Sequence, residues 1–150
     1  MIQLIRTNSG NADFISLVKK LDADLAQRDG KEHSFYARFN KIDQIRFAIV
    51  AHENGTAVGC GAMKEYDPVT MEIKRMYVVP EWRGKRVAAV ILSELEKWAR
   101  ELFAGRCVLE TGLRQPEAIQ LYTRQGYQHI ENYGQYIGVE NSVCFEKHLV

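Results

Sequence analysis

The fold is decided by a short basic loop, Val79-Pro80-Glu81-Trp82-Arg83-Gly84-Lys85-Arg86-Val87-Ala88. The residues before it, Met71 to Val79, predict a strand that stops at a proline. The residues after it, Val87 to Leu102, carry apolar side chains at steps of three and four and predict a helix of about four turns. The first turn of a helix presents unpaired N–H groups, and Arg83, Lys85 and Arg86 add full charges. The loop is therefore suited to bind phosphate, although a plain solvated turn would share its composition.

Length and composition restrict the class of protein. The chain has 150 residues, which predicts one domain over residues 1–150. Its 20 Lys and Arg against 19 Asp and Glu give a net charge of +1. A general nucleic-acid or membrane-surface binder carries a large basic excess, so we expect neither partner. The start, Met1-Ile2-Gln3-Leu4-Ile5-Arg6, does not resemble a secretory signal, and the expected location is cytoplasmic.

The remaining elements follow from hydrophobic period and turn residues. We predict helices over Phe14 to Leu25, over part of Lys31 to Asp43, and from Pro116 to a closing Gly126. We predict strands over Ile2 to Arg6, Arg46 to His52, Thr56 to Lys64, Cys107 to Leu109, Tyr127 to Ile130, Tyr136 to Val139 and Ser142 to Phe145. This order indicates an α/β (α+β) protein whose mixed sheet carries helices on its faces.

Several common chemistries have no support in the sequence. There is no Gly-x-x-x-x-Gly-Lys-Ser/Thr loop, and no Gly-x-Gly-x-x-Gly follows a strand. Cys60, Cys107 and Cys144 are widely spaced among apolar neighbours, so we expect reduced core residues. The four histidines lack ligand spacing, and we therefore expect no metal site.

Two stretches resemble the signatures of a known family. The first is Met76-Tyr77-Val78-Val79-Pro80-x-x-Arg83-Gly84-Lys85-x-Val87-Ala88, which is similar to the acyl-CoA pyrophosphate loop of the GNAT superfamily of N-acyltransferases. The second is Ala118-Ile119-x-Leu121-Tyr122-x-x-x-Gly126-Tyr127, which resembles the family's helix and turn with a catalytic tyrosine. The resemblance covers nearly the whole chain. It implies the GNAT fold, with a mostly antiparallel central sheet and helices on both faces.

The resemblance also implies that acetyl-CoA binds as a cosubstrate in a V-shaped opening. This opening would lie between the strand ending at Val79 and the strand beginning near Cys107. Backbone groups of Met76, Tyr77 and Val78 would pair with the acetyl and pantetheine amides. The pyrophosphate would be held by Arg83, Gly84, Lys85, Arg86, Val87 and Ala88.

Two residues depart from the family pattern. Glycine usually stands where this chain has Arg86, and we attribute that glycine to clearance for the pyrophosphate. Because a helical backbone does not itself require glycine, we expect Arg86 to fit with its side chain pointing outward. Asparagine often stands where this chain has Gln115, which keeps an amide and is a candidate contact to the coenzyme.

For the chemistry, an amine must lose a proton and the departing thiolate must gain one. By resemblance, Tyr122 would face the sulfur as general acid, although its spacing equally suits a core aromatic. The base is left open between Glu72, which we expect to share a strand face with Lys74 and Met76, and Glu110 at the mouth of the next strand. Each is equally an ordinary strand-end carboxylate.

The expected activity is transfer of acetyl to a primary amine of a small molecule, by direct attack in a ternary complex. The alternatives are acetylation of protein lysines or N-termini, and a non-catalytic acyl-CoA-binding regulator. GNAT proteins often form homodimers, and the late strands here could pair across subunits. From their positions, the candidate acceptor-site residues are Glu32, His33, Phe35, Tyr36, Tyr133 and Tyr136.

Overall fold

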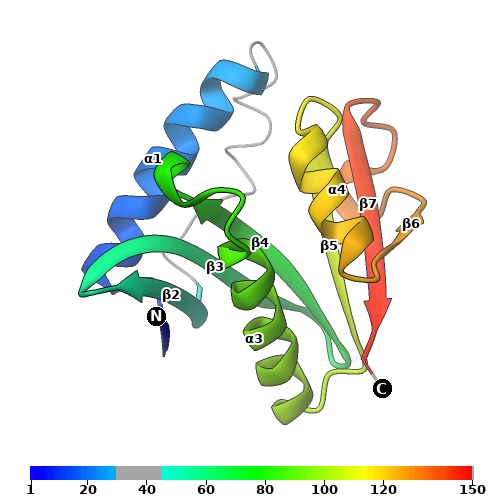
Figure 1. The fold of residues 1–150 in the computed structure, drawn as a ribbon. Coiled ribbons are helices and arrows are strands. Elements are labelled where there is room, and N and C mark those ends of the chain that lie inside the picture. Colours follow the sequence, from blue (N-terminus) through cyan, green and yellow to red (C-terminus); the bar gives the residue numbers. More distant parts are fainter. Residues whose placement is uncertain (30–44, 150) are drawn as a thin grey trace.

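The computed structural model describes residues 1–29 and 45–149 (Figure 1). One sheet holds seven strands in the order β1-β2-β3-β4-β5-β7-β6. The strands are β1 (Ile2–Thr7), β2 (Phe47–Glu53), β3 (Thr56–Asp67), β4 (Thr70–Val78), β5 (Arg106–Gly112), β6 (Gln128–Ile130) and β7 (Ser142–His148). The helices are α1 (Ala12–Asp29), α3 (Val87–Glu101) and α4 (Pro116–Arg124), with short 3-10 turns η2 (Pro80–Trp82) and η3 (Gly134–Tyr136).

The sheet is mixed and mostly antiparallel, as predicted. Within it, β4 and β5 are the parallel pair, and the other neighbouring strands run antiparallel. The helix predicted within Lys31 to Asp43 lies outside the described residues. Within the described residues, no helix combines the length and apolar character needed to cross a bilayer.

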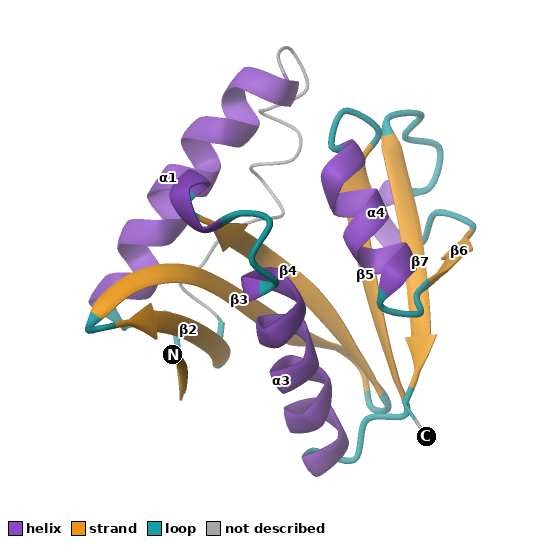
Figure 2. Cartoon of the chain, viewed as in Figure 1, coloured by secondary structure: helices purple, strands orange, loops and turns teal. Residues whose placement is uncertain are grey.

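Helices cover both faces of the sheet (Figure 2). A Cβ on Gly59 or Gly61 of β3 would stand within 3.1 Å of Ile91, so this face of β3 carries α3 at very close range. On the other face, Arg75 of β4 forms an ion pair with Asp22 of α1. The apolar sides of both helices are buried against the sheet, and each fully buried leucine or isoleucine contributes about 1.5–3 kcal/mol. The largest fully buried side chains of the two helices are Phe14, Leu17, Val87, Ile91, Leu92 and Leu95.

The two halves of the sheet are joined over a short distance. β4 pairs with β5 from Thr70 to Glu72, opposite Arg106 to Val108. Beyond Glu72, β4 continues to Val78 paired with β3 on one side, while β5 continues to Gly112 paired with β7. Figure 1 shows the result as two arms that meet near the C-terminus and diverge. The β4 edge that faces β5 is therefore left without a neighbouring strand.

A β-bulge interrupts β4 in its divergent part. The ladder between β3 and β4 shifts register at this point, so that Gly61 alone stands opposite both Arg75 and Met76. Arg75 takes a left-handed conformation, with φ of 59°. Such a bulge inserts one extra residue and redirects the side chains that follow it.

The bulge changes which β4 side chains share a face. Lys74 and the bulged Arg75 both lie on the α1 face, whereas Met76 lies on the α3 face. We expected Glu72, Lys74 and Met76 to share one face. For Met76 this expectation was wrong, because the extra residue reverses the alternation of the strand.

The predicted strand over Tyr136 to Val139 was also wrong. Tyr136 is the last residue of η3, and the residues after it form a turn in which Gly138 has a positive φ. The side-chain amide of Asn132 donates to the carbonyls of Tyr136 and Val139 at 3.1 and 3.0 Å. These local bonds satisfy the backbone groups that a strand would have paired with a neighbour.

Candidate active site

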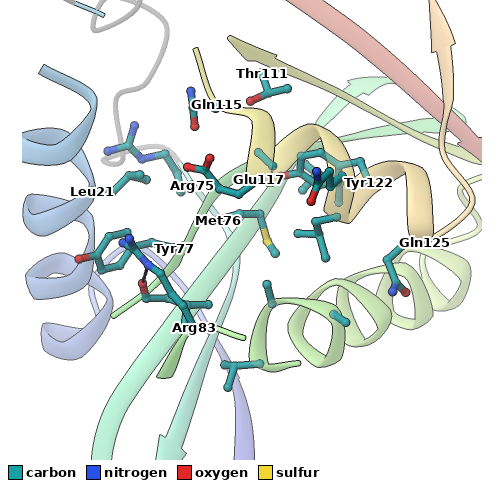
Figure 3. A pocket seen from close by; sticks show the side chains of 18 of the residues that line it. Leu21, Arg75, Met76, Tyr77, Arg83, Thr111, Gln115, Glu117, Tyr122 and Gln125 are labelled. Carbon is teal, nitrogen blue, oxygen red and sulfur yellow. Dashed lines mark hydrogen bonds between the residues drawn. The ribbon is translucent and has the colours of Figure 1, made fainter. Parts of the chain in front are cut away.

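A cavity of about 480 Å³ lies between the two arms of the sheet (Figure 3). Pockets that hold small ligands have volumes of ~300–1,000 Å³. One wall is the free edge of β4, and the opposite wall comes from the end of β5 and from α4. In Figure 3, Met76 and Tyr77 lie across the cavity from Tyr122 and Gln125. The residues that line it therefore come from both arms.

The edge of β4 presents backbone hydrogen-bonding groups to this cavity. The Val79 N–H donates to the Val58 carbonyl across the ladder at 3.0 Å. Because bonding directions alternate along an antiparallel strand, the backbone groups of Val78 point away from β3 and toward the opening. The Val78 carbonyl accepts a bond of 2.8 Å from Nε of Arg83. An extended ligand with amide groups could pair with such an edge as an added strand.

The loop after β4 turns sharply into α3. Gly84 and Arg86 both have positive φ, at 77° and 67°. Helix α3 begins at Val87, and no side chain caps its N-terminus. The first-turn residues Val87 and Ala88 line the cavity, together with Arg83. Uncapped N–H groups beside guanidinium groups form a suitable site for a phosphate.

Tyr122 lies on α4 and is 6% exposed. Its ring packs 5.8 Å from the ring of Tyr127 and 6.4 Å from that of Phe145. Burial raises the pKa of Tyr122, and the nearby charge of Glu110 raises it further. The phenol is therefore held in its protonated form at the wall of the cavity, where it can act as a proton donor.

Two carboxylates line the same cavity as Tyr122. Glu72 accepts a bond of 2.6 Å from the Tyr133 hydroxyl, and its other oxygen lies 3.6 Å from the Lys74 ammonium. Glu110 accepts a bond of 2.7 Å from the Ser142 hydroxyl. Burial and the charge of Glu72 raise the pKa of Tyr133, so this phenol keeps its proton and remains the donor. A proton donor and two acceptors thus surround one space.

Comparison with known proteins decides the family. The family model described as "Acetyltransferase (GNAT) family" matches residues 15–127. The chain belongs to the GNAT family of acetyltransferases. It is an acyltransferase, and its cosubstrate is acetyl-CoA.

Individual relatives agree with this GNAT assignment. An IAA acetyltransferase of Azospirillum brasilense is 33% identical over 138 residues, which cover 90% of each protein. A crystal structure from Klebsiella pneumoniae, of a protein assigned as an acyl-CoA N-acyltransferase, has a TM-score of 0.85 and 32% identity, covering 100% of this chain and 99% of that one. A GNAT acetyltransferase of Elizabethkingia anophelis with acetyl-CoA bound shares the fold, with a TM-score of 0.70 and 17% identity over 99% and 98% of the two chains.

The residues of this GNAT protein fit acetyl-CoA. The free edge of β4 offers backbone partners for the amides of the coenzyme, and the uncapped start of α3 offers N–H groups for its pyrophosphate. Lys85 does not line the cavity, and its ammonium lies over the Trp82 ring, 4.6 Å from the centroid. The other expected coenzyme contacts that line the cavity are Met76, Tyr77, Val78, Arg83, Gly84, Arg86, Val87, Ala88 and Gln115.

The structure describes only some of the residues that we expected at the acceptor site. Tyr136 lines the cavity, while Tyr133 reaches it through its bond to Glu72. The remaining four, Glu32, His33, Phe35 and Tyr36, lie outside the described residues. Sequence reasoning missed Lys74 and Arg75, both of which line the cavity. A strict alternation would have placed them on opposite faces, and no residue pattern signals the bulge.

No metal site is found in the described part of the chain, where no three His, Cys, Asp or Glu side chains are grouped to hold an ion. Cys60, Cys107 and Cys144 are free and buried. Burial raises the pKa of Cys60 and Cys107 to about 12. These thiols are protonated at neutral pH and are poor nucleophiles.

The backbone conformation of Arg86 differs from the one we expected. We expected a helical residue, but Arg86 precedes α3 and lies in the left-handed region, with φ of 67°. An L-residue pays roughly 1–2 kcal/mol for this conformation, whereas glycine does not. The backbone itself, and not clearance alone, therefore favours the glycine that the family usually has here.

We predict that Arg86→Gly is more stable than Arg86→Ala by about 1 kcal/mol in urea unfolding, because glycine alone relieves the left-handed strain. Both variants lack the guanidinium, so their difference reports the backbone. We also expect Arg86→Gly to change acetyl-CoA affinity by less than tenfold, or about 1.4 kcal/mol, in calorimetric titration. Equal stability of the two variants, or complete loss of binding, would contradict this account.

Proposed function

We propose that this acetyltransferase moves the acetyl group of acetyl-CoA to a primary amine of a small molecule, by direct attack in a ternary complex. The observation that carries this proposal is the placement of Tyr122, Glu72 and Glu110 around one cavity between the arms. Glu72 and Tyr122 are each less than a tenth exposed, so an acceptor must enter the cavity to reach them. Buried candidate catalytic groups favour a small amine over a protein surface, and the name of the Azospirillum brasilense relative agrees with this.

Each proposed step is assigned to a group that lines the cavity. Bound acetyl-CoA supplies an activated acyl carbonyl next to the free edge of β4. Glu72 or Glu110 accepts a proton from the incoming amine, directly or through water. The amine nitrogen bonds to the acyl carbon, the carbon–sulfur bond breaks, and Tyr122 donates a proton to the departing sulfur. The proton taken from the amine then balances the one that Tyr122 has lost. The buried, protonated cysteines offer no thiolate, which supports direct transfer without a covalent enzyme intermediate. Free cysteines also agree with the proposed cytoplasmic location.

The direct test is release of free thiol from acetyl-CoA in the presence of a panel of amines. We expect Tyr122→Phe to lower kcat by about 100-fold or more, because general acid catalysis typically contributes 10²–10⁴-fold. Its acetyl-CoA affinity should change little. Tyr66→Phe is the matched control, since Tyr66 is exposed and lies outside the cavity wall, and it should retain full activity.

Three results would redirect the proposal. Tight coenzyme binding without turnover on any amine would indicate a non-catalytic regulator. Turnover on peptides alone would indicate acetylation of protein lysines or N-termini. Full activity of Tyr122→Phe would remove Tyr122 from the chemistry.

The pH dependence of kcat/KM should identify the base. A carboxylate base is inactive when protonated, so activity of the wild type should fall as the pH falls through its pKa. We expect either Glu72→Gln or Glu110→Gln to be slow and to lose this acidic limb, because glutamine cannot titrate. The other variant should keep the limb. If both variants keep it, neither carboxylate is the base and the amine loses its proton in another way.

A further inference from the structure

The bulge in β4 places two cationic side chains next to each other on the cavity wall. Lys74 and Arg75 both line the cavity, although they are consecutive residues of a strand. The arrangement requires Arg75 to adopt a left-handed backbone, which is strained for an L-residue. Strained residues of this kind are concentrated at ligand sites.

Arg75 has unused hydrogen-bonding capacity. Its side chain is 1% exposed, and one terminal nitrogen forms an ion pair with Asp22 of α1. Its Nε is buried and has no partner within the described part of the chain. A buried donor without a partner is destabilising, so such a group calls for an explanation. In Figure 3 the guanidinium extends from β4 past Leu21 toward α1, at the end of the cavity away from Arg83.

The Lys74 ammonium can also accept a further anionic partner. Its side chain is 6% exposed, and its ammonium lies 3.6 Å from Glu72, which is longer than an ordinary hydrogen bond. The second oxygen of Glu72 is already bonded to Tyr133. Burial lowers the pKa of Lys74, and the charge of Glu72 opposes this shift. An anion placed beside Lys74 and Arg75 would satisfy both.

That anion is distinct from the phosphates of the coenzyme. The strand from Lys74 to Val78 spans roughly 13 Å at ~3.3 Å per residue. The loop that fits pyrophosphate begins beyond this point, at Arg83. Lys74 and Arg75 instead adjoin Glu72, at the end of the cavity where the amine is deprotonated in the proposed function.

We propose that the acceptor is a carboxylate-bearing amine of amino-acid type, with its carboxylate bound by Arg75 and Lys74. The inference rests on the proposed function and names its substrate class. A planar guanidinium matches the geometry of a carboxylate, and a buried ammonium adds charge without demanding a fixed angle. The neighbouring carboxylates, Glu72 and Glu110, face the amine of the same molecule. The site thus carries both signs of charge, as a zwitterionic acceptor requires.

The test compares pairs of acceptors that differ by one carboxylate: phenylalanine with phenethylamine, tryptophan with tryptamine, and lysine with cadaverine. We expect the wild type to show a kcat/KM at least tenfold higher for the carboxylate-bearing member of its preferred pair. In Lys74→Gln and in Arg75→Gln this ratio should fall below threefold, through loss of activity on the carboxylate-bearing member alone. A preference for the bare amines, or an equal fall for both members, would overturn the proposal.

Lys97→Gln is the matched control, because it removes one exposed positive charge from α3, outside the cavity wall. It should keep the wild-type ratio. Thermal unfolding checks that each variant folds. If Arg75→Gln does not fold, the acceptor ratio of Lys74→Gln decides the test. If no amine is turned over, the proposed function fails. The carboxylate site is then tested by calorimetric titration of the same pairs into protein saturated with coenzyme A. Tighter binding of the carboxylate-bearing members supports it, and equal binding overturns it.

Discussion

The architecture of the site depends on the short pairing between β4 and β5. The two strands share the three residue pairs from Thr70 to Glu72, and each then follows its own antiparallel partner. A strand edge without a neighbour is normally a liability, since its N–H and C=O groups remain unpaired. Here that edge lines a cavity, and buried polar side chains gather along it, among them Glu72, Lys74 and Arg75. The separation of β4 from β5 therefore opens a candidate binding site in a sheet that would otherwise be continuous.

Much of this fold could be predicted because its signals are local. Pro80 ends β4, Pro116 begins α4, and Gly126 follows that helix at φ of 92°, so single residues place these boundaries well. The bulge at Arg75 could not be predicted, because it exists only in the register between two strands. The turn after η3 was missed for a related reason: the Asn132 side chain competes with strand pairing, and period alone does not report such competition.

The candidate site divides in the same way. The candidate phosphate loop and Tyr122 lie in contiguous motifs, so their resemblance to the GNAT signatures was enough to propose them, and both line the cavity. The acceptor end depends on groups that meet only in three dimensions, such as Glu72 and Tyr133, which are far apart in the chain. Arg86 shows a further limit, because residue type does not reveal that its backbone is left-handed. Function is thus most visible in the sequence at the proposed coenzyme site, and least visible at the proposed acceptor site.

The central claim is that acetyl-CoA occupies the opening between β4 and β5. Hydrogen exchange followed by mass spectrometry, with and without acetyl-CoA, tests it most directly. The account predicts slower exchange in peptides covering Met76 to Val78 and the first turn of α3 from Val87. It predicts no change in β2, whose two edges are already paired. Protection that is absent from β4 and from the start of α3, or that appears only in β6 and β7, would contradict the account.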